Sequence, residues 1–306
     1  MKISRRRFLQ WTAASAAALG LSKFDLERLD NVVLAAGTKP PVIWLQGAAC
    51  SGCSISLLNS IKETTIDDFL LNKVDMKYHH NLMTATGDLA ISTLDQAAID
   101  HNGDFILIIE GGVPTADNGV YCVLTERDGQ PWTMLDAVNE LGSQAKYVIN
   151  VGTCAAFGGV PAAGPNPTGI KDVNSILNSN TTNPIINLPG CPTHPYIIMS
   201  TVIDLLLNGM PILDYKGRPE TFYSNALHDR CPYESGYPEV KELGMEGCYE
   251  AIGCRGPETY VNCHTLKWNN EVNWCIQANN LCIGCASETF PQSIFYKIGT
   301  SYSEDD

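Results

Sequence analysis

The stretch Asp104-Phe-Ile-Leu-Ile-Ile-Glu110-Gly-Gly112 gives the clearest structural signal in this chain of 306 residues. Five consecutive apolar residues that end at two glycines are typical of a strand buried on both faces of a parallel sheet. Further short strand-like runs occur on both sides of it, at residues 41–46, 74–79, 146–151 and 184–188. Helical stretches lie between several of them, at about residues 54–62, 134–141 and 195–207. This alternation predicts an α/β fold with a flavodoxin-like, doubly wound parallel sheet.

The chain holds twelve cysteines, and eleven of them fall into three groups, with Cys122 left over. The first group is dispersed through the predicted sheet region and consists of Cys50, Cys53, Cys154 and Cys191. The second consists of Cys231, Cys248 and Cys254, preceded by His228, and the third of Cys263, Cys275, Cys282 and Cys285. If His228 is a ligand, twelve side chains are available for three [4Fe–4S] clusters. We therefore predict a protein that moves electrons.

The first group follows the ends of predicted strands. Cys50 and Cys53 come after the first strand, Cys154 after the fourth and Cys191 after the fifth. Because ligand sites in open α/β sheets form outside the carboxyl ends of the strands, we expect these thiols to meet at one edge of the sheet. Cys53 and Cys191 also stand near predicted helix starts, where free backbone N–H groups are expected to hydrogen-bond to cluster sulfurs.

The composition changes from about Pro219, where strand-like runs stop and Gly, Pro, Asn and Tyr become frequent. A region with so few apolar periods cannot depend on a large core, so we expect cluster ligation to supply much of its folding free energy. We therefore predict an irregular, cluster-stapled C-terminal domain at residues 219–306. Residues 37–218 form the predicted flavodoxin-like domain, and no internal repeat divides either part.

The N-terminus carries an export pattern. Ser4-Arg5-Arg6-Arg7-Phe8-Leu9 precedes an Ala-rich apolar stretch that is too short to cross a membrane. We predict that residues 1–36 are a twin-arginine signal peptide and that the mature chain begins near residues 36–38. No other stretch is long and apolar enough to span a bilayer, so we expect a periplasmic protein that is soluble or held at a membrane by a partner.

Charge narrows the classes of partner. The formal net charge is −13, and the predicted signal peptide contributes +3 from six basic and three acidic residues, which leaves −16 for the mature chain. An acidic surface argues against nucleic acid and favours a basic partner, such as a positively charged electron carrier.

Two other interpretations of the cysteines compete with iron–sulfur ligation. Exported chains rich in cysteine often contain disulfides, and Cys/His sets also suit zinc. The chain is long enough to bury a core without disulfides, and its C-x2-C pairs lie in glycine-bearing loops suited to a shared metal centre. An exported disulfide-rich binding protein remains the alternative from a different functional class.

The motifs around these cysteines closely resemble the small, electron-transferring subunit of [NiFe] hydrogenases. The resemblance runs from residue 41 to about 290. The matching stretches are Trp44-Leu-Gln-Gly-Ala-Ala-Cys50-Ser-Gly-Cys53, Glu110-Gly-Gly, Gly152-Thr-Cys154, Leu188-Pro-Gly-Cys191-Pro-Thr-His-Pro195, His228-Asp-Arg-Cys231, Gly253-Cys254-Arg-Gly-Pro257 and Cys282-Ile-Gly-Cys285.

The resemblance implies a role for each group. The first group is expected to hold a proximal [4Fe–4S] cluster, the second, with His228, a distal one, and the third a medial one between them. It further implies a hydrogenase, H2 ⇌ 2H+ + 2e−, whose Ni–Fe centre lies on a separate large subunit, with this chain passing electrons to an acceptor such as a multihaem c-type cytochrome. The alternative within the same chemistry is an iron–sulfur subunit of a related oxidoreductase.

One position departs from the common family pattern. Where most members carry a proline and hold a medial [3Fe–4S] cluster, this chain reads Asn273-Trp274-Cys275-Ile276. A fourth thiolate predicts a medial [4Fe–4S] cluster, and a [3Fe–4S] cluster if Cys275 is not a ligand. The feature resembles the [NiFeSe] subclass, in which selenocysteine of the large subunit binds the nickel.

Overall fold

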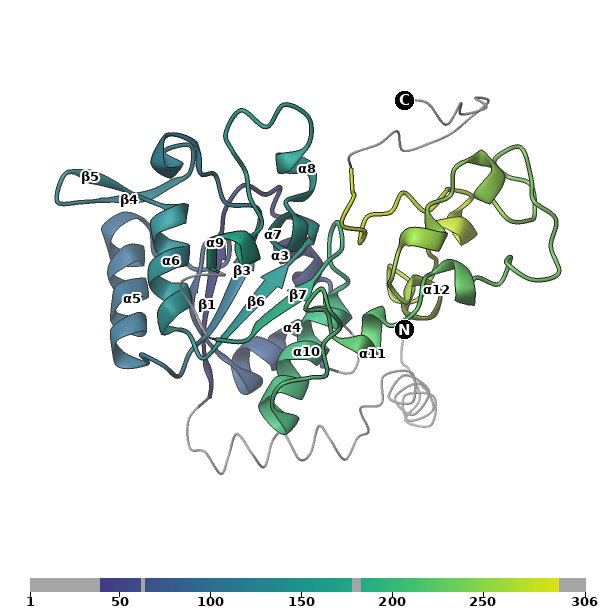
Figure 1. Ribbon diagram of the computed structural model, residues 1–306. Coiled ribbons are helices and arrows are strands. Elements are labelled where there is room, and N and C mark those ends of the chain that lie inside the picture. The colour runs from purple at the N-terminus through teal and green to yellow at the C-terminus, as the bar shows by residue number, and fades with distance from the viewer. Residues whose placement is uncertain (1–38, 62–63, 178–182, 292–306) are drawn as a thin grey trace.

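The computed structural model describes residues 39–61, 64–177 and 183–291. The predicted signal peptide, the predicted mature start and the end of the helix predicted at 54–62 lie outside these residues. Figure 1 shows a layered α/β part to the left and a C-terminal region of loops and short helices to the right. Among the described residues, no helix is long and apolar enough to cross a membrane.

Five parallel strands form the central sheet, in the order β2-β1-β3-β6-β7. This is the strand order of a flavodoxin-like sheet with a hairpin inserted after its third strand, and it confirms the predicted fold class. The five strands are β1 (Pro41–Gln46), β2 (Asp75–His79), β3 (Ile106–Glu110), β6 (Tyr147–Val151) and β7 (Ile185–Leu188). The hairpin pairs β4 (Val123–Arg127) with β5 (Gln130–Thr133) in antiparallel register.

The helices vary from a single turn to four turns. They are α3 (Gly52–Leu58), α4 (Ile66–Asp68), α5 (Gly87–Asp100), α6 (Met134–Gln144), α7 (Thr153–Phe157), α8 (Gly159–Ala162), α9 (Val173–Leu177), α10 (Pro195–Asn208), α11 (Glu220–Tyr223) and α12 (Cys263–Leu266). A π-helical turn at Phe69–Lys73 and 3₁₀ turns at Ala116–Gly119, His228–Arg230, Glu250–Ile252, Gly256–Glu258 and Ile276–Ala278 complete them.

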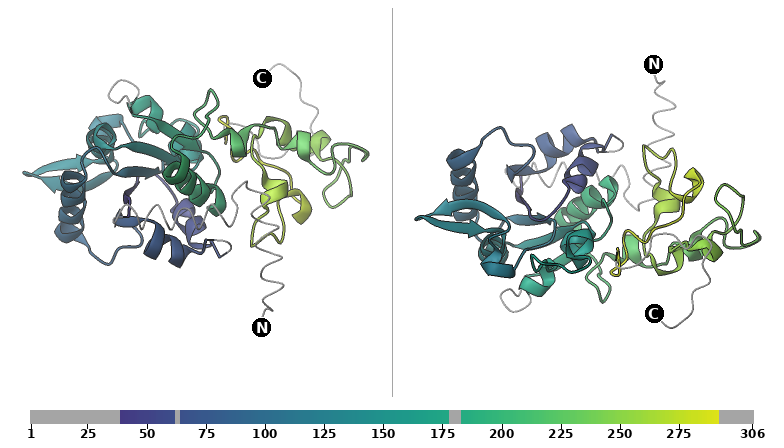
Figure 2. Two further views of the ribbon diagram at one scale, coloured as in Figure 1. Left: turned by 90° about the horizontal axis from the view of Figure 1, so that it is seen from below. Right: turned by 90° about the horizontal axis from the view of Figure 1, so that it is seen from above.

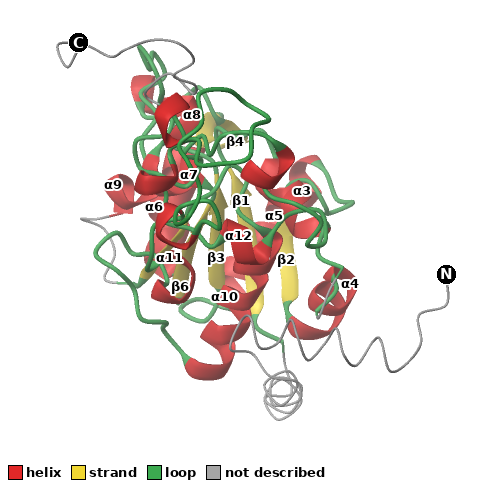
Figure 3. Cartoon of the chain, turned by 90° about the vertical axis from the view of Figure 1, so that its right-hand side faces the viewer, coloured by secondary structure: helices red, strands yellow, loops and turns green. Residues whose placement is uncertain are grey.

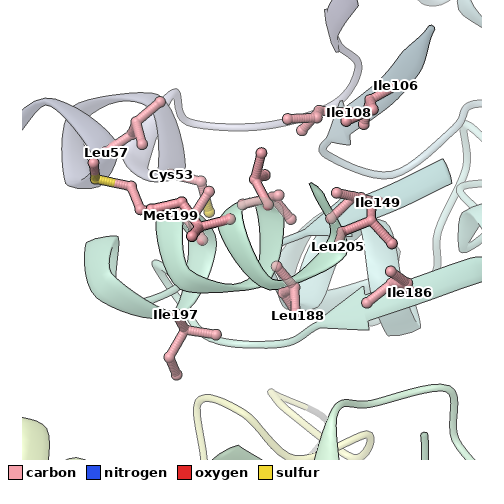
Figure 4. Packing of buried hydrophobic residues seen from close by; sticks show 14 of the residues in the cluster. Cys53, Leu57, Ile106, Ile108, Ile149, Ile186, Leu188, Ile197, Met199 and Leu205 are labelled. Carbon is pink, nitrogen blue, oxygen red and sulfur yellow. The ribbon is translucent and has the colours of Figure 1, made fainter. Parts of the chain in front are cut away.

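The sheet has two apolar faces because successive side chains of each strand point to opposite sides. On β3, Ile106 and Ile108 pack against α3 and α10, whereas Leu107 and Ile109 pack against α5, α6 and α9. Figure 4 shows the first of these clusters, with Met199 of α10 between the strand residues and helix α3, which carries Cys53 and Leu57. The near-continuous apolar runs noted in the sequence are therefore strands covered on both sides.

Several elements of the α/β part were not predicted, namely α5, the β4–β5 hairpin and the short helices α4, α7, α8 and α9. Helix α5 turns small buried residues toward the sheet and leaves Leu89 and Ile99 more than 60% exposed, so its apolar pattern is blurred in the sequence. The β4–β5 hairpin turns at Asp128-Gly129, a dipeptide that strongly favours tight hairpin turns and was a usable signal.

The C-terminal region has little regular structure. Residues 219–291 contain no β-strand, and their own apolar cluster consists of eight buried residues, among them Trp274, Leu281 and Cys282. Figure 3 views the molecule from the side of this region, whose loops and short helices lie in front of the sheet. Phe222 and Tyr223 of α11 pack against the strand core, so the first residues after the predicted boundary at 218 belong physically to the α/β part. The boundary itself stays a prediction.

Candidate metal-binding sites

The first cysteine set assembles at the carboxyl edge of the parallel sheet. Cys50 and Cys53 follow β1, Cys154 is the second residue of α7 after β6, and Cys191 lies in the turn after β7. Burial raises the pKa of Cys154 to about 12, and the proximity of Cys191 and Cys50 adds to the rise. The pKa of Cys53 is raised well above its ordinary value by burial, then by Glu110 and Cys154. Four thiols from three loops therefore face one another, as the strand-end argument predicted.

Two glycines leave space for these sulfurs. A Cβ atom on Gly152 would lie 2.8 Å from the Cys53 Sγ, and one on Gly159 would lie 3.0 Å from the Cys154 Sγ. Both glycines have positive φ, 93° and 53°, where other residues are strained. The glycines that flank Cys154 are thus required both by backbone conformation and by the close approach of the thiols.

Glu110 organises the loop that carries Cys53. This carboxylate is 2% exposed and accepts hydrogen bonds from the Cys53 N–H at 2.9 Å, the Ser54 N–H at 3.3 Å and the Trp44 indole at 3.2 Å. The Ser54 hydroxyl also donates to it. The N–H groups of Cys53 and Ser54 at this helix start therefore bond to Glu110, where the sequence suggested bonds to cluster sulfurs.

Cys191 also differs from expectation. It lies four residues before the first residue of α10, in a turn joined to Pro192 by a cis peptide bond. Its N–H donates to the Sγ of Cys285, a member of the third set.

The second set surrounds one small cavity in the C-terminal region. His228, Cys231, Cys248 and Cys254 all line it. Ligand atoms of His228, Cys248 and the exposed carboxylate of Glu250 lie within 4.8 Å of one another. The Nε2 atom of His228 is 3.6 Å from the Glu250 Oε2. The structure thus brings all four predicted residues to one place and adds a carboxylate that the sequence argument did not single out.

The third set lies where the two parts of the chain meet. Burial raises the pKa of Cys263 well above its ordinary value, and the proximity of Cys285, Cys282 and Cys275 adds to the rise. Cys263 packs against both the strand core and the small C-terminal cluster. The thiols of Cys275, Cys282 and Cys285 therefore all lie close enough to Cys263 to raise its pKa.

The surroundings of the sulfurs fit metal-bound thiolates. Burial raises the pKa of Cys285 to about 11, so an isolated thiol there would stay protonated at neutral pH, whereas a bound cation favours the thiolate. N–H groups already point at many of the sulfurs, as around iron–sulfur clusters. The donor pairs are Thr193 to Cys53, Val160 to Cys154, Tyr233 to Cys231, Gly256 and Cys282 to Cys254, Gly284 to Cys282, Cys191 to Cys285, and the Trp268 side chain to Cys263.

Residues outside the three sets have structural roles. All twelve cysteines lie in the described part of the chain and are free thiols, which does not favour the disulfide interpretation. Cys122 packs, half-buried, against the second face of the sheet. His194 caps α10 and its Nε2 lies 2.6 Å from the Lys267 carbonyl oxygen, so it fastens the C-terminal region to the α/β part. Sequence reasoning missed the threonines beside the cysteines, Thr153 and Thr193, although their adjacency in the motifs was a signal.

Comparison with known proteins identifies the family. Residues 50–205 match the family model "NADH ubiquinone oxidoreductase, 20 Kd subunit", residues 223–296 match the model for the C-terminal part of the NiFe/NiFeSe hydrogenase small subunit, and residues 2–22 match a twin-arginine translocation signal. The chain is 35% identical to the periplasmic [NiFeSe] hydrogenase small subunit of Desulfomicrobium baculatum, over 97% of this chain and 99% of that protein. It is 38% identical to the periplasmic [NiFe] hydrogenase small subunit 1 of Nitratidesulfovibrio vulgaris, over 96% and 93%.

Solved structures agree with this assignment. The [NiFeSe] hydrogenase of Desulfovibrio vulgaris Hildenborough matches with a TM-score of 0.80 and 40% identity, covering 85% of this chain and 98% of that one. The [NiFeSe] hydrogenase of Desulfomicrobium baculatum matches with a TM-score of 0.77 and 37% identity, covering 83% and 96%.

The fold and the cysteine sets define an electron-transferring oxidoreductase subunit, and the chain belongs to the small-subunit family of [NiFe] and [NiFeSe] hydrogenases. Small subunits of this family carry iron–sulfur clusters and pair with a large subunit that holds the catalytic site. The predicted electron-relay function and hydrogenase class are confirmed. The twin-arginine signal and the periplasmic relatives confirm the predicted export to the periplasm.

Proposed function

We propose that this chain relays electrons through three [4Fe–4S] clusters, between the Ni–Fe site of a large subunit and an external carrier. The proximal cluster is held by Cys50, Cys53, Cys154 and Cys191, the medial by Cys263, Cys275, Cys282 and Cys285, and the distal by His228, Cys231, Cys248 and Cys254. One observation supports this series above all. The medial set touches both others, because the Cys191 N–H donates to the Cys285 Sγ and the Cys282 N–H donates to the Cys254 Sγ.

When bound, the clusters supply centres that accept and release one electron at a time. The residues of this chain supply the thiolates, the surrounding N–H donors and the exclusion of water. N–H groups aimed at a sulfur stabilise negative charge there, so they favour the reduced state of whatever the sulfur ligates. Deep burial of Cys53 and Cys282 works in the opposite direction, because an apolar environment disfavours added charge.

We propose that the large subunit docks beside the proximal set. Cys50 is exposed, and on the neighbouring α3 and the residues after it, Ile55 and Ile61 are 56% and 58% exposed. A pocket of about 560 Å³ adjoins them and is also lined by Tyr196 and Trp268. Burial of this apolar surface by the partner would bring the catalytic centre close to the first cysteine set.

The external carrier is expected at the opposite end, next to the distal set. The His228 side chain is 24% exposed, which makes it a suitable exit for electrons. The Glu250 carboxylate lies 3.6 Å from the His228 Nε2. In the segment 229–258 that holds the distal set, the exposed cations are Arg230 and Lys241, and the exposed carboxylates are Asp229, Glu234, Glu239, Glu242, Glu246, Glu250 and Glu258. Such an acidic segment suits a basic partner, and we propose a multihaem c-type cytochrome.

We propose that Cys275 is the fourth medial ligand and places the chain with the [NiFeSe] subclass. The Cys275 thiol raises the pKa of both Cys263 and Cys285 by its proximity, which supports its membership of this set. A fourth iron in place of an open corner lowers the potential of the medial centre toward those of its neighbours.

Iron and sulfide analysis together with EPR of the purified heterodimer tests the proposal. We expect an iron and sulfide content that accounts for three four-iron clusters in this chain, and S = 1/2 signals when the protein is reduced. The Cys275→Ala variant should lose one iron and show a [3Fe–4S] signal when oxidised, whereas the control Cys122→Ala should keep the wild-type iron content and spectrum. A reduced protein without iron–sulfur signals would overturn the cluster proposal. A [3Fe–4S] signal in the intact oxidised wild type would overturn the assignment of Cys275.

A further inference from the structure

The contact between the proximal and medial sets is fixed by a single buried threonine. Thr153 is 1% exposed and stands between Gly152 and Cys154. Its hydroxyl accepts a hydrogen bond from the Gly190 N–H at 2.9 Å and donates to the carbonyl oxygen of Cys285. Its own N–H donates to the Gly190 carbonyl oxygen at 2.9 Å. One side chain thus ties the loops of Cys154 and Cys191 to the segment that carries Cys285.

The hydrogen bond between the two sets lies inside this arrangement. The Cys191 N–H follows directly after Gly190 and donates to the Cys285 Sγ. A second tether acts on the same loop, because the Tyr223 hydroxyl donates to the Pro189 carbonyl oxygen at 2.9 Å. Tyr223 is 1% exposed, so neither tether is open to water. The position of the Cys191 N–H relative to the Cys285 sulfur is therefore set by Thr153 from one side and Tyr223 from the other.

The contact between the medial and distal sets has the same form. The Cys282 N–H donates to the Cys254 Sγ, and the Arg255 N–H returns a bond to the Cys282 carbonyl oxygen at 2.8 Å. A buried threonine stands there too, since the Thr259 Oγ1 lies 3.6 Å from the Cys282 Sγ and donates to the Arg255 carbonyl oxygen. The same arrangement occurs at both contacts of the medial set, which indicates that the surrounding residues hold the N–H···S contacts between sets in place.

We propose that Thr153 is a positioning residue for electron transfer, whose hydroxyl holds the Cys191 N–H against the Cys285 sulfur and so couples the proximal to the medial set. This inference rests on the proposed function. An electron moving between the sets then crosses covalent bonds of Cys191 and one hydrogen bond, a closer electronic path than a gap between unbonded atoms. The same N–H stabilises negative charge on the Cys285 sulfur, so it raises the potential of the group ligated there.

The Thr153→Val variant tests this inference because it keeps the shape of the side chain and removes both hydroxyl bonds. A hydrogen bond is worth about 1 kcal/mol, so its loss lowers the ratio of reduced to oxidised medial cluster about fivefold at a given potential. For a one-electron couple this corresponds to a decrease of about 40 mV in the reduction potential of the medial cluster. EPR-monitored redox titration of the heterodimer measures it. Rapid freeze-quench EPR after mixing with H2 should show slower reduction of the medial cluster, with isotope exchange between H2 and D2O unchanged, because exchange needs only the large-subunit site.

Matched variants separate positioning from general damage. Thr153→Ser keeps the hydroxyl and should restore the wild-type potential and rate. Thr133→Val removes an equally buried hydroxyl, the N-cap of α6, and should lower stability without moving any cluster potential. Tyr223→Phe removes the second tether and should shift the medial potential in the same direction as Thr153→Val, which provides a second measurement if the valine variant does not assemble.

Three outcomes are distinguishable. Wild-type medial potential and reduction rate in Thr153→Val, or in Tyr223→Phe if only that variant assembles, would overturn the role of the hydrogen-bonded contact. An equal shift in Thr133→Val would also overturn it, because the effect would then follow from stability alone. Absence of the three cluster signals in the wild type would instead overturn the proposed function, and iron analysis of the same samples shows which of these has occurred.

Discussion

The two parts of this molecule reach an ordered structure by different means. The α/β part has five parallel strands with an apolar cluster on each face, and fully buried residues such as Trp44, Leu107 and Ile149 belong to these clusters. The region from 219 to 291 has eight buried residues in its own cluster, and the half-buried residues packed against it include three of the predicted ligands, Cys231, Cys254 and Cys263. Three members of this small core, Leu227, Tyr249 and Ile276, line the cavity of the second set of predicted ligands.

Backbone conformation shows the same contrast. In the short segment 267–279, Lys267, Asn269, Asn270, Glu271 and Asn279 all adopt positive φ, a region that costs free energy for residues other than glycine. A few apolar contacts are not enough to hold such a backbone, so a further source of stability is needed. The two parts are not independent, however, because Val261 and Ala286 of the second part pack into the strand core of the first. Figure 2 shows the two parts side by side in two further views.

Removal of iron should have the largest effect, because it should unfold the C-terminal part and leave the α/β part folded. We expect the iron-free protein to keep hydrogen-exchange protection in β1, β3 and β6, while amides in 224–285 exchange nearly as fast as in an unfolded chain. The reason is that metal binding in such regions supplies folding free energy of the order of a domain's whole stability, about 5–15 kcal/mol. Hydrogen exchange read by mass spectrometry on loaded and iron-free protein makes the measurement. Equal protection of both parts without iron would contradict the contrast.

Two leucines of equal burial sharpen the comparison. Leu107 lies in β3 and Leu281 in the C-terminal cluster, and both are fully buried. Leu107→Ala should lower the free energy of unfolding by about 2–5 kcal/mol in loaded and iron-free protein alike. Leu281→Ala should be costly only in the loaded protein, because its surroundings are already unfolded without iron. Denaturant unfolding of both variants, each in loaded and in iron-free form, measures these changes. A lower free energy of unfolding for Leu281→Ala in the iron-free protein would show that this core forms without metal.

The same contrast explains how much the sequence could predict. Strands such as β3 were predictable because apolar runs ending in glycine report burial on both faces, and the order of strand ends placed Cys50, Cys154 and Cys191 at one edge. Helix α5 was missed because its buried positions are mostly alanines, which carry little periodic signal. The β4–β5 hairpin was missed although Asp128-Gly129 marked its turn.

The sequence predicted which residues belong to each of the three sets, but not the hydrogen bonds that these residues make. Cysteine spacing and motif resemblance named the three sets, and the structure brings the members of each set together. The occupation of the α3 N–H groups by Glu110 and the bond from Cys191 to the third set depend on tertiary contacts between segments 57 and 94 residues apart. No local pattern encodes such contacts, because both partners are ordinary loop or strand-end residues when seen alone.

Two glycines test whether the first set depends on close packing as well as on ligation. Gly152 and Gly129 both have positive φ, 93° and 74°, but a Cβ at Gly129 would meet nothing within 4 Å. Gly129→Ala should therefore cost only the backbone strain, about 1 kcal/mol. Gly152→Ala adds a clash with the Cys53 Sγ and should cost more and also lower the iron content. Thermal unfolding measures the stability of both variants, and iron analysis measures their iron content. Full iron content in Gly152→Ala would mean that the first loops adjust independently of the sheet.

The smallest expected effect concerns His79, a buried titratable group of the α/β part. Its ring is 1% exposed, stacks on Trp44 at 4.8 Å and accepts the Asn81 N–H at Nδ1, and burial lowers its pKa to about 4 from an ordinary 6.5. Between these values the unfolded chain binds more protons than the folded one, so stability falls as the pH drops. From pH 6.5 to 5.5 the loss attributable to this group is about 1 kcal/mol.

A variant isolates this contribution. His79→Gln removes the titration, so the difference in unfolding free energy between wild type and variant should change by about 1 kcal/mol over that pH interval. Other histidines with lowered pKa values, such as His194 and His264, cancel in the difference because both proteins contain them. Denaturant unfolding at several pH values makes the comparison. A constant difference would show that His79 has the same pKa in the folded and in the unfolded chain, so that this face of the sheet admits a charge which its burial argues against.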